Sequence, residues 1–412
     1  MKIKSHPDDT NTLMKSRCPP GFDQHDVEPP PLAGWKGKIR ALALDLAGKC
    51  NLGCRYCAER STQPPRTAMT EEVMEAAWSF LFPGGQSSGG ASIRLGSGKP
   101  LLAFPLMMRL SELIAGHDKK HSTGPPAVFL TTNGTLIDSN IADWLAASGW
   151  HVKISLDGPG DVHDAWRVTP DGQGTFEQVS TAAAVLAQRI PELLSVTAVL
   201  CRGADPKHVF DAIAGLGVRR IELVPVAHHD QAVRPGNEEI RQYEAFVDEY
   251  ARHYEEGGSN LPTLVRFARC VTRAMGYSVS RVSCGAGRPF LGVGPAGDIY
   301  PCFRFIGIES YRLGSLSSGL DNRAVLAFGD GPGRPYEQRT ACNTCWAAPL
   351  CGGPCFACAE LFGPGNGQPL EYQCAYSLAD ARAAVWLVNR LKTRNPGRLL
   401  SFLPGAVEVS EI

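Results

Sequence analysis

The 412-residue sequence has no excess of charge of either sign, because 41 lysines and arginines balance 41 aspartates and glutamates. A general nucleic-acid binder normally carries a basic surplus that neutralises phosphates. The composition therefore argues against that class, and we expect no nucleic-acid partner.

Long apolar runs are missing as well. No stretch approaches the roughly 20 apolar residues of a membrane helix, and Met1–Trp35 contains no apolar segment like a secretory signal. We therefore expect a cytoplasmic protein with no membrane partner. Residues 1–36 are polar and rich in proline, and are predicted to form an extended arm rather than a domain.

Disulfide bonds are not expected, because fourteen cysteines in a chain without a secretion signal fit metal binding better. Most of these cysteines follow residue 269, which predicts a separate C-terminal unit. Within it, residues 284–375 are poor in strand patterns and dense in glycine, proline and cysteine. Such a region cannot assemble a large apolar core by itself, so bound metal clusters are expected to supply stability.

Between residues 37 and 230, strand-like and helix-like segments alternate. The expected strands are Arg40–Leu46, Ser92–Leu95, Ala127–Thr131, His151–Ser155, Val196–Leu200 and Arg220–Val224. The expected helices between them are Glu71–Leu81, Pro105–Ile114, Ile141–Ala147, Phe176–Arg189 and Pro206–Ala214. This alternation predicts an α/β fold with a parallel sheet, a partial (β/α)6 TIM-type barrel. Active sites of such barrels lie at the C-terminal ends of the strands.

Three further segments complete the predicted organisation. Residues 231–283 are expected to be a helical connector containing the polar helix Glu238–Glu255. Residues 284–375 form the cysteine-rich domain, and 376–412 a closing helix and tail, with an amphipathic pattern over Ala375–Lys392.

The first strand is followed by three cysteines, Cys50, Cys54 and Cys57, in the spacing C-x3-C-x2-C. Three thiolates on one loop can hold three irons of a 4Fe–4S cluster and leave the fourth iron open to a substrate. A zinc knuckle, a disulfide cluster or buried structural thiols are the alternatives. Zinc sites usually take four protein ligands in two pairs, and no fourth ligand lies nearby in the sequence.

This loop, with Tyr56 before its third cysteine, closely resembles the radical S-adenosylmethionine (radical SAM) superfamily. The resemblance implies that the open iron binds the amino and carboxylate groups of SAM. It also implies that reductive cleavage of SAM gives a 5'-deoxyadenosyl radical that abstracts a hydrogen atom from the substrate. Cys50, Cys54 and Cys57 would then be the catalytic metal ligands, and an external flavodoxin- or ferredoxin-type donor would supply electrons.

The later cysteines resemble the SPASM extension of radical SAM enzymes, which carries two auxiliary 4Fe–4S clusters. The spacing C-x12-G-x4-C is followed by C-x2-C-x5-C-x3-C and a final cysteine. Carried over from the family, one cluster would use Cys284, Cys302 and Cys355. The other would use Cys342, Cys345, Cys351 and Cys374. The chain would then bind SAM and three 4Fe–4S clusters.

An eighth cysteine completes the first auxiliary cluster in some SPASM proteins, but Gly276–Ser283 contains none. That cluster either keeps an open iron or is completed by Cys270 or another residue. Cys358 lies outside the family pattern. The simplest interpretation of Cys18, Cys201, Cys270 and Cys358 is that they are ordinary thiols.

A SAM pocket is expected beside the barrel strands. Ser97, Gly98, Lys99 and Pro100 stand where the family has Gly-Gly-Glu-Pro. Gly98 and Pro100 match this motif, and Lys99 replaces the usual acid. Either backbone carbonyls alone hold the SAM ammonium here, or SAM binding is weakened. The remaining expected contacts are Tyr56, Asn133, Ser155, Arg167 and Val224.

Local structure offers alternative explanations for parts of this set. Asn133 and Asp157 precede glycine and also suit turns, and Val224 equally suits a plain core strand. Arg167 is chemically suited to the SAM carboxylate through its two-pronged guanidinium. His228-His229-Asp230 follows the sixth strand and is either a substrate or metal site or an exposed loop.

The resemblance favours an enzyme that oxidatively modifies or cross-links a side chain of a ribosomal precursor peptide. The first 36 residues are too short for a leader-binding winged helix, so a separate leader-binding protein or direct docking is expected. The alternatives are an anaerobic sulfatase-maturing, formylglycine-forming enzyme and a small-molecule radical SAM dehydrogenase. In sulfatase-maturing enzymes an aspartate base follows the equivalent of Cys302, where this chain has Phe303. A non-catalytic iron–sulfur carrier is the remaining possibility, and only Lys99 favours it.

Overall fold

The computed structural model describes residues 19, 38–85, 90–118, 124–258, 261–365 and 367–402. Cys18 and nearly all of the predicted N-terminal arm lie outside these residues. Within the described chain, no helix combines the length and apolar character needed to cross a bilayer.

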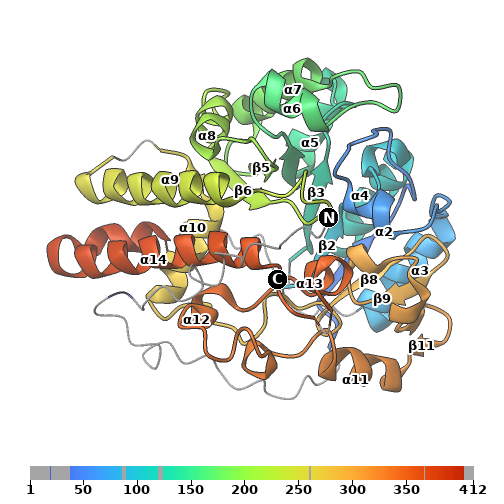
Figure 1. Ribbon diagram of the computed structural model, residues 1–412. Helices are drawn as coiled ribbons and strands as arrows, with labels where there is room; N and C mark the ends of the chain where they lie inside the picture. The colour runs from blue at the N-terminus through green and yellow to red at the C-terminus, as the bar shows by residue number, and fades with distance from the viewer. Residues whose placement is uncertain are drawn as a thin grey trace, which may run out of the picture.

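Strands and helices alternate along the first half of the chain (Figure 1). The strands are β1 Ala41–Leu44, β2 Ser92–Leu95, β3 Ala127–Thr132, β4 His151–Ser155, β5 Leu194–Leu200, β6 Arg220–Pro225, β7 Thr263–Leu264, β8 Phe290–Val293, β9 Asp298–Tyr300, β10 Gly314–Ser315 and β11 Gly319–Leu320. The α-helices are α2 Ala58–Thr62, α3 Glu71–Leu81, α4 Phe104–Asp118, α5 Ser139–Ser148, α6 Gly160–Trp166, α7 Phe176–Arg189, α8 Pro206–Ala214, α9 Asn237–Glu256, α10 Val265–Ala274, α11 Asn322–Asp330, α12 Ala348–Cys351, α13 Phe356–Phe362 and α14 Glu371–Arg394. Short 3-10 helices include η3 Pro100–Ala103 and η4 Phe303–Phe305.

The described strands form one sheet in the order β11-β10-β9-β8-β1-β2-β3-β4-β5-β6-β7. Strands β1 to β6 are parallel neighbours, as the alternating sequence pattern predicts. The two ends of the sheet do not pair within the described chain, so the barrel is partial. The predicted α/β partial barrel is confirmed.

Local chemistry explains several element boundaries. Thr70 accepts a hydrogen bond from the Val73 amide at the start of α3, and Asp205 accepts one from His208 at the start of α8. The first strand ends at Leu44, before the expected Leu46, because the buried Asp45 carboxylate turns the chain by accepting the Gly48 amide at 2.9 Å.

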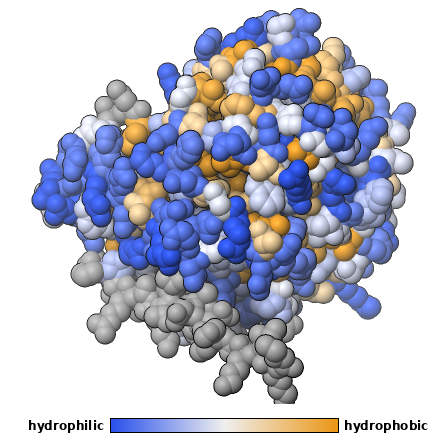
Figure 2. Space-filling model, turned by 45° about the horizontal axis from the view of Figure 1, so that its top comes forward, coloured by the Kyte–Doolittle hydropathy of each residue, from blue (hydrophilic) through white to orange (hydrophobic). Residues whose placement is uncertain are grey.

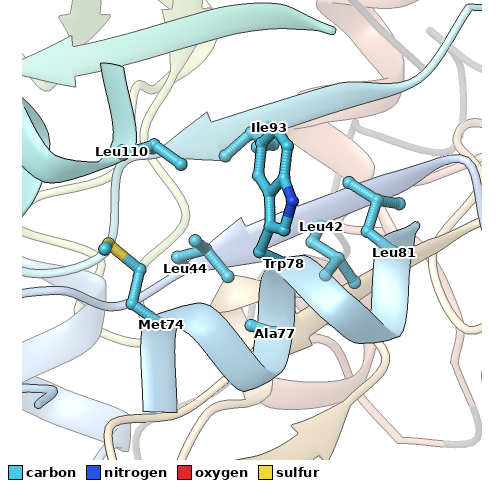
Figure 3. A pocket seen from close by; sticks show the side chains of 8 residues that line it. All are labelled: Leu42, Leu44, Met74, Ala77, Trp78, Leu81, Ile93 and Leu110. Carbon is cyan, nitrogen blue, oxygen red and sulfur yellow. The ribbon is translucent and has the colours of Figure 1, made fainter. Parts of the chain in front are cut away.

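Apolar side chains on one face of the sheet pack against the outer helices. Figure 3 shows this contact where α3 lies over the first two strands, with Met74 and Trp78 facing Leu42, Leu44 and Ile93. The space left between these side chains is too small for a water molecule. This part of the molecule is therefore packed core rather than a binding site.

The cysteine-rich segment is joined to the barrel through the sheet. Strand β8 lies parallel beside β1, with Ala41 opposite Phe290, and β9 continues antiparallel. Buried Phe290, Phe305 and Phe328 belong to the same hydrophobic core as the barrel strands. The proposed boundary at residue 284 thus separates two parts that share one sheet and one core.

The closing helix α14 packs against α9 and α10 (Figure 1). It begins at Glu371, four residues before the expected start, so that Cys374 lies in its first turn. The far ends of α9 and α14 form the mainly hydrophilic left end of the molecule in Figure 2, where Arg394 pairs with Glu255 at 2.7 Å.

Candidate active site

The loop Cys50–Cys57 leaves the C-terminal end of β1 and leads directly into α2. Two backbone hydrogen bonds fix it to the segment after α6: the Gly53 amide donates to the Val168 carbonyl at 2.7 Å, and the Arg55 amide donates to the Trp166 carbonyl at 2.9 Å. The loop is therefore held against the segment at the end of α6.

The three thiols of this loop are free and partly exposed. Burial raises the pKa of Cys54, the Arg167 guanidinium opposes this, and the thiols of Cys57 and Cys50 raise it further. Asn133 points its amide nitrogen toward the Cys50 sulfur at 4.0 Å, and the Leu52 amide donates to the same sulfur at 3.3 Å.

These donors suit a 4Fe–4S cluster better than a single ion. Nowhere in the described chain do three His, Cys, Asp or Glu side chains converge on one metal ion. In a 4Fe–4S cluster each cysteine binds a different iron, so the thiolates surround the cluster and need not meet at one point. Arg167 and Lys99 oppose part of the effect of burial on Cys54, and the Leu52 amide donates to the Cys50 sulfur, so these groups help to hold thiolates, the form that binds metal.

Tyr56 belongs to a buried network behind the loop. Its hydroxyl donates to the Asp157 carboxylate at 2.5 Å, and Arg167 Nε donates to the same oxygen at 2.9 Å. The Arg167 guanidinium also lies over the Tyr56 ring, 5.4 Å from its centre. The other Asp157 oxygen accepts the Val199 amide at 2.9 Å. Asp157 is thus a fully buried ion-pair partner that ties the loop to β5, and not simply a turn residue.

His163 supports this network from α6. Its Nδ1 accepts the Asp157 amide at 3.2 Å, and its Nε2 lies 3.0 Å from the Thr175 hydroxyl. Thr175 donates its own proton to the Arg167 carbonyl, so the imidazole is neutral and carries its proton on Nε2. Burial lowers the pKa of His163 to about 4.

The segment Gly96–Pro100 approaches the cysteine loop closely. Gly98 adopts a φ of +58°, and a Cβ there would lie 2.7 Å from the Lys49 carbonyl oxygen. The Lys99 amide donates to that same carbonyl at 2.9 Å. Only glycine allows this contact, so this segment is pinned beside the first cysteine.

Glu59, in the first turn of α2, brings a carboxylate to this segment. Its Oε2 accepts the Gly98 amide at 2.9 Å and lies 4.0 Å from Arg66 Nη2. Burial raises the pKa of Glu59, while Lys99 and the Gly98 amide lower it. Sequence reasoning missed Glu59, although its place two residues after Cys57 was a usable signal.

Arg66 links the segment Gly96–Pro100 to the end of β1. It pairs with the fully buried Asp45 at 2.6 Å and donates to the Ser97 hydroxyl at 3.3 Å. Ser97 is itself buried. The segment Ser97–Lys99 therefore has two carboxylates beside it: Glu59, which accepts the Gly98 amide, and Asp45, which pairs with the Arg66 that contacts Ser97.

The other expected SAM contacts lie around the barrel mouth. Asn133 is buried and donates to the Asn51 side chain at 2.9 Å, so it braces the cysteine loop. Ser155 and Val224 are partly exposed at the C-terminal ends of β4 and β6. Arg167 is already engaged by Asp157, which differs from the free carboxylate-binding role expected for it.

The first C-terminal cysteine set comes together from three segments. Burial raises the pKa of Cys302, and the thiols of Cys355 and Cys284 raise it further, which shows that the three lie near one another. Cys358 joins this set, because it donates a hydrogen bond to Cys355 that holds the pKa of Cys355 below its usual range.

The second set assembles from the α12 region and the first turn of α14. Burial raises the pKa of Cys374, and nearby thiols raise it further; these are Cys351, Cys342 and Cys345. Apart from Cys358, these two groups contain the cysteines expected for the two auxiliary clusters, and the clusters themselves stay a prediction.

The remaining features of interest lie at the edges of these sites. Cys201 is buried beside Tyr56 and Val226. In the loop after β6, His228 accepts the Asp230 amide at 3.1 Å, while the His229 ring packs 5.1 Å from that of Phe362. These contacts fit a structured loop at the barrel mouth.

Comparisons with known proteins agree with this geometry. The sequence profile of the radical SAM superfamily matches residues 45–223. The chain is 25% identical to the serine-type anaerobic sulfatase-maturating enzyme of Klebsiella aerogenes, over 79% of this chain and 81% of that protein. It is 27% identical to the PqqA peptide cyclase of Xanthomonas oryzae pv. oryzae, over 86% of this chain and 90% of that protein.

A solved structure shares the fold. Native anSMEcpe with bound AdoMet and Cp18Cys peptide superimposes with a TM-score of 0.69 at 20% identity, covering 85% of this chain and 98% of that one. The matched profile, the partial barrel and the two cysteine patterns agree. Residues 45–223 therefore form a domain of the radical SAM superfamily.

Proposed function

We propose that this protein is a peptide maturase that oxidatively modifies or cross-links a side chain of a ribosomal precursor peptide. The observation that carries the proposal is the cysteine loop at the barrel mouth, held beside the segment Gly96–Pro100. Its relatives include a named peptide cyclase and a sulfatase-maturating enzyme, each aligned over most of both chains.

In this proposal Cys50, Cys54 and Cys57 hold a 4Fe–4S cluster that binds SAM. Such a cluster supplies, with SAM, a 5'-deoxyadenosyl radical for hydrogen abstraction. The protein's own part is to position these groups. The buried Tyr56–Asp157–Arg167 network fixes the loop to the barrel, and Asn133 braces it from β3.

The Glu59 carboxylate would pair with the positively charged ammonium group of SAM, which the positively charged Lys99 cannot do. Its carboxylate lies at the Gly98 amide, on the segment where the family places an acid. Its side chain is 25% exposed, so it remains accessible to a ligand. The acid missing at position 99 is thus supplied from α2, and Ser97, Gly98 and Lys99 contribute backbone groups.

The two C-terminal cysteine sets would hold auxiliary clusters that accept an electron from the modified peptide, making the overall reaction an oxidation. An external donor of the flavodoxin or ferredoxin type would deliver the electron that starts each turnover. The peptide would either be presented by a separate leader-binding protein or dock directly.

Sulfatase maturation is the second candidate, favoured by the similarity to the Klebsiella aerogenes enzyme. Phe303 argues against it. Its position after Cys302 lacks a carboxylate base, and the neighbouring Arg304 guanidinium lies over its ring, 5.6 Å from the centre.

The test is to incubate anaerobically reconstituted protein with SAM, dithionite and a deuterated peptide encoded beside this chain. The proposal predicts deuterium in 5'-deoxyadenosine and a peptide that has lost two hydrogen atoms. A parallel reaction with a sulfatase active-site peptide serves as the control. Formylglycine in that control, with an unchanged precursor peptide, would contradict the proposal and support the second candidate.

A further inference from the structure

We propose that Cys358 is the fourth protein ligand of the auxiliary cluster held by Cys284, Cys302 and Cys355. The inference rests on the proposed function, which assigns a cluster to those three cysteines. It goes further because the family pattern supplies only three cysteines for this cluster in this chain, and Cys358 would be the fourth.

Helix geometry brings Cys358 to this site. Cys355 is the N-cap of α13, and Cys358 lies in the first turn of the same helix, three residues later. Residues at this spacing lie on neighbouring parts of one helix face. The two side chains meet, and the Cys358 thiol donates a hydrogen bond to the Cys355 sulfur.

Other members of the set lie near Cys358 as well. The Cys302 thiol is close enough for its charge to act on Cys358, and the Arg304 guanidinium lies close to both cysteines. Cys284 in turn acts on Cys302. Cys358 therefore belongs to the same group of four thiols, and at 8% exposure it is largely withdrawn from solvent.

The other spare cysteine of this region does not lie in that group. Cys270, on α10, points toward the Leu350 carbonyl at 4.0 Å, and the cysteine that acts on it is Cys351 of the second set. The segment Gly276–Ser283, where some family members carry an additional cysteine, has none. Cys358 thus takes the place of the cysteine that Gly276–Ser283 lacks.

Ligation by Cys358 is a simple exchange. The thiol loses its proton to solvent, and the thiolate forms one Fe–S bond to the fourth iron; no electron is transferred. The Arg304 guanidinium compensates part of the added negative charge. A cluster closed in this way moves electrons and has no open iron for substrate.

The test uses the full chain in which Cys50, Cys54 and Cys57 are all replaced by Ala, so that only auxiliary clusters contribute. In this parent we compare Cys358→Ala with Cys270→Ala, a matched change of a buried cysteine beside the other set. The measurements are iron and sulfide per chain, the electron paramagnetic resonance spectrum of the dithionite-reduced protein, and its change on adding cyanide, which binds an open iron.

The expected result is a parent spectrum insensitive to cyanide and a Cys358→Ala spectrum that shifts with it. Loss of one iron from the Cys358→Ala cluster on mild oxidation is also expected, while Cys270→Ala behaves as the parent. A cyanide-sensitive parent, or identical behaviour of parent and Cys358→Ala, would overturn the inference. A parent without auxiliary iron would refute the cluster assignment itself, which separates failure of the proposed function from failure of this ligand.

Should Cys358→Ala fail to fold, the unmodified chain provides a second test. Two samples of the unmodified chain are compared, one as apoprotein and one after cluster reconstitution. Each is denatured without reductant in the presence of iodoacetamide and then digested, so that the labelling of each cysteine can be followed. Ligation is supported if Cys358 is alkylated rapidly in the apoprotein but slowly in the holoprotein, with the same delay as Cys302. Labelling of Cys358 at the same rate in both forms would contradict it.

Discussion

At the scale of single residues, the site is built from charges that are buried in pairs. Asp157 has no exposed surface and Arg167 only 7%, and each satisfies the other. A buried charge without a partner is far more costly than an exposed one. The rigidity of the cysteine loop therefore depends on residues that need not touch the substrate.

Arg167→Ala is expected to destabilise the folded protein by about 3–5 kcal/mol, because it leaves the Asp157 carboxylate buried and unpaired. Chemical unfolding of the reconstituted protein measures this change. Arg219→Ala is the control, since Arg219 forms an exposed pair with Glu192, and pairs of that kind contribute at most about 1 kcal/mol. Equal effects of the two substitutions would contradict the buried-pair argument.

Glu59→Gln is expected to weaken SAM binding roughly tenfold to a hundredfold, the effect of losing about 1.5–3 kcal/mol from one charged hydrogen bond. Calorimetric titration of SAM into the unreduced, reconstituted protein measures it without turnover. Glu177→Gln, an exposed change on α7, should bind SAM like the unmodified protein. Unaltered SAM affinity in Glu59→Gln would show that backbone groups alone hold the ammonium.

At the scale of elements, helices α6 and α14 hold residues of the predicted sites in place. Helix α6 presents both His163 and, just after its end, Arg167 to the buried Asp157. Helix α14 carries Cys374 in its first turn and Asp380 in its interior. Changes within these helices should therefore reach the metal sites.

The burial of neutral His163 predicts a pH dependence of stability. Its pKa is about 4 in the folded protein and about 6.5 when unfolded. The unfolded chain therefore takes up a proton first as the pH falls. Its contribution is fully present above about pH 6.5 and is lost progressively toward pH 4, by up to about 3 kcal/mol.

Unfolding free energies of the unmodified protein and His163→Gln, compared between pH 7 and pH 5, measure this contribution. The slope with pH should be smaller in the variant. A slope that does not change on substitution would assign the effect to other groups.

Asp380 holds α14 to its neighbours. Its carboxylate accepts a hydrogen bond from the Tyr243 hydroxyl of α9 at 2.7 Å and one from Arg266 Nε of α10 at 3.0 Å, and the residue is 1% exposed. Asp380→Ala is expected to destabilise the protein by about 3–5 kcal/mol, since it leaves Arg266 unpaired, and to lower iron binding by the set that includes Cys374. Arg382→Ala, on the same helix with a partly exposed pair to Glu244, is the control. Unfolding curves and iron content together test both effects.

At the scale of the whole molecule, the sheet joins the barrel to the cysteine-rich segment through β8 and β1. Local patterns predicted much of the barrel. The expected bounds of α3, α7 and α8 agree with the structure, because the amphipathic spacing of each helix is local to its sequence. Side-chain caps from Thr70 and Asp205 also mark the starts of α3 and α8. Strands β2 and β4 also agree.

Long-range contacts were beyond sequence reasoning. Nothing local to Phe290–Val293 indicates that this strand pairs with β1. The position of Glu59 against Gly98 depends on how two loops meet, and the partner of Arg167 on the packing of α6 over the barrel mouth. The grouping of the cysteines followed from family resemblance, whereas the place of Cys358 required the geometry of α13.

The most direct test of the central claim is iron, sulfide and 5'-deoxyadenosine per chain in anaerobically reconstituted protein given SAM and dithionite. The unmodified chain should hold about twelve irons and cleave SAM, while replacement of Cys50, Cys54 and Cys57 by Ala should leave about eight irons and no cleavage. SAM cleavage retained in that variant, or about four irons in the unmodified chain, would contradict the three-cluster account.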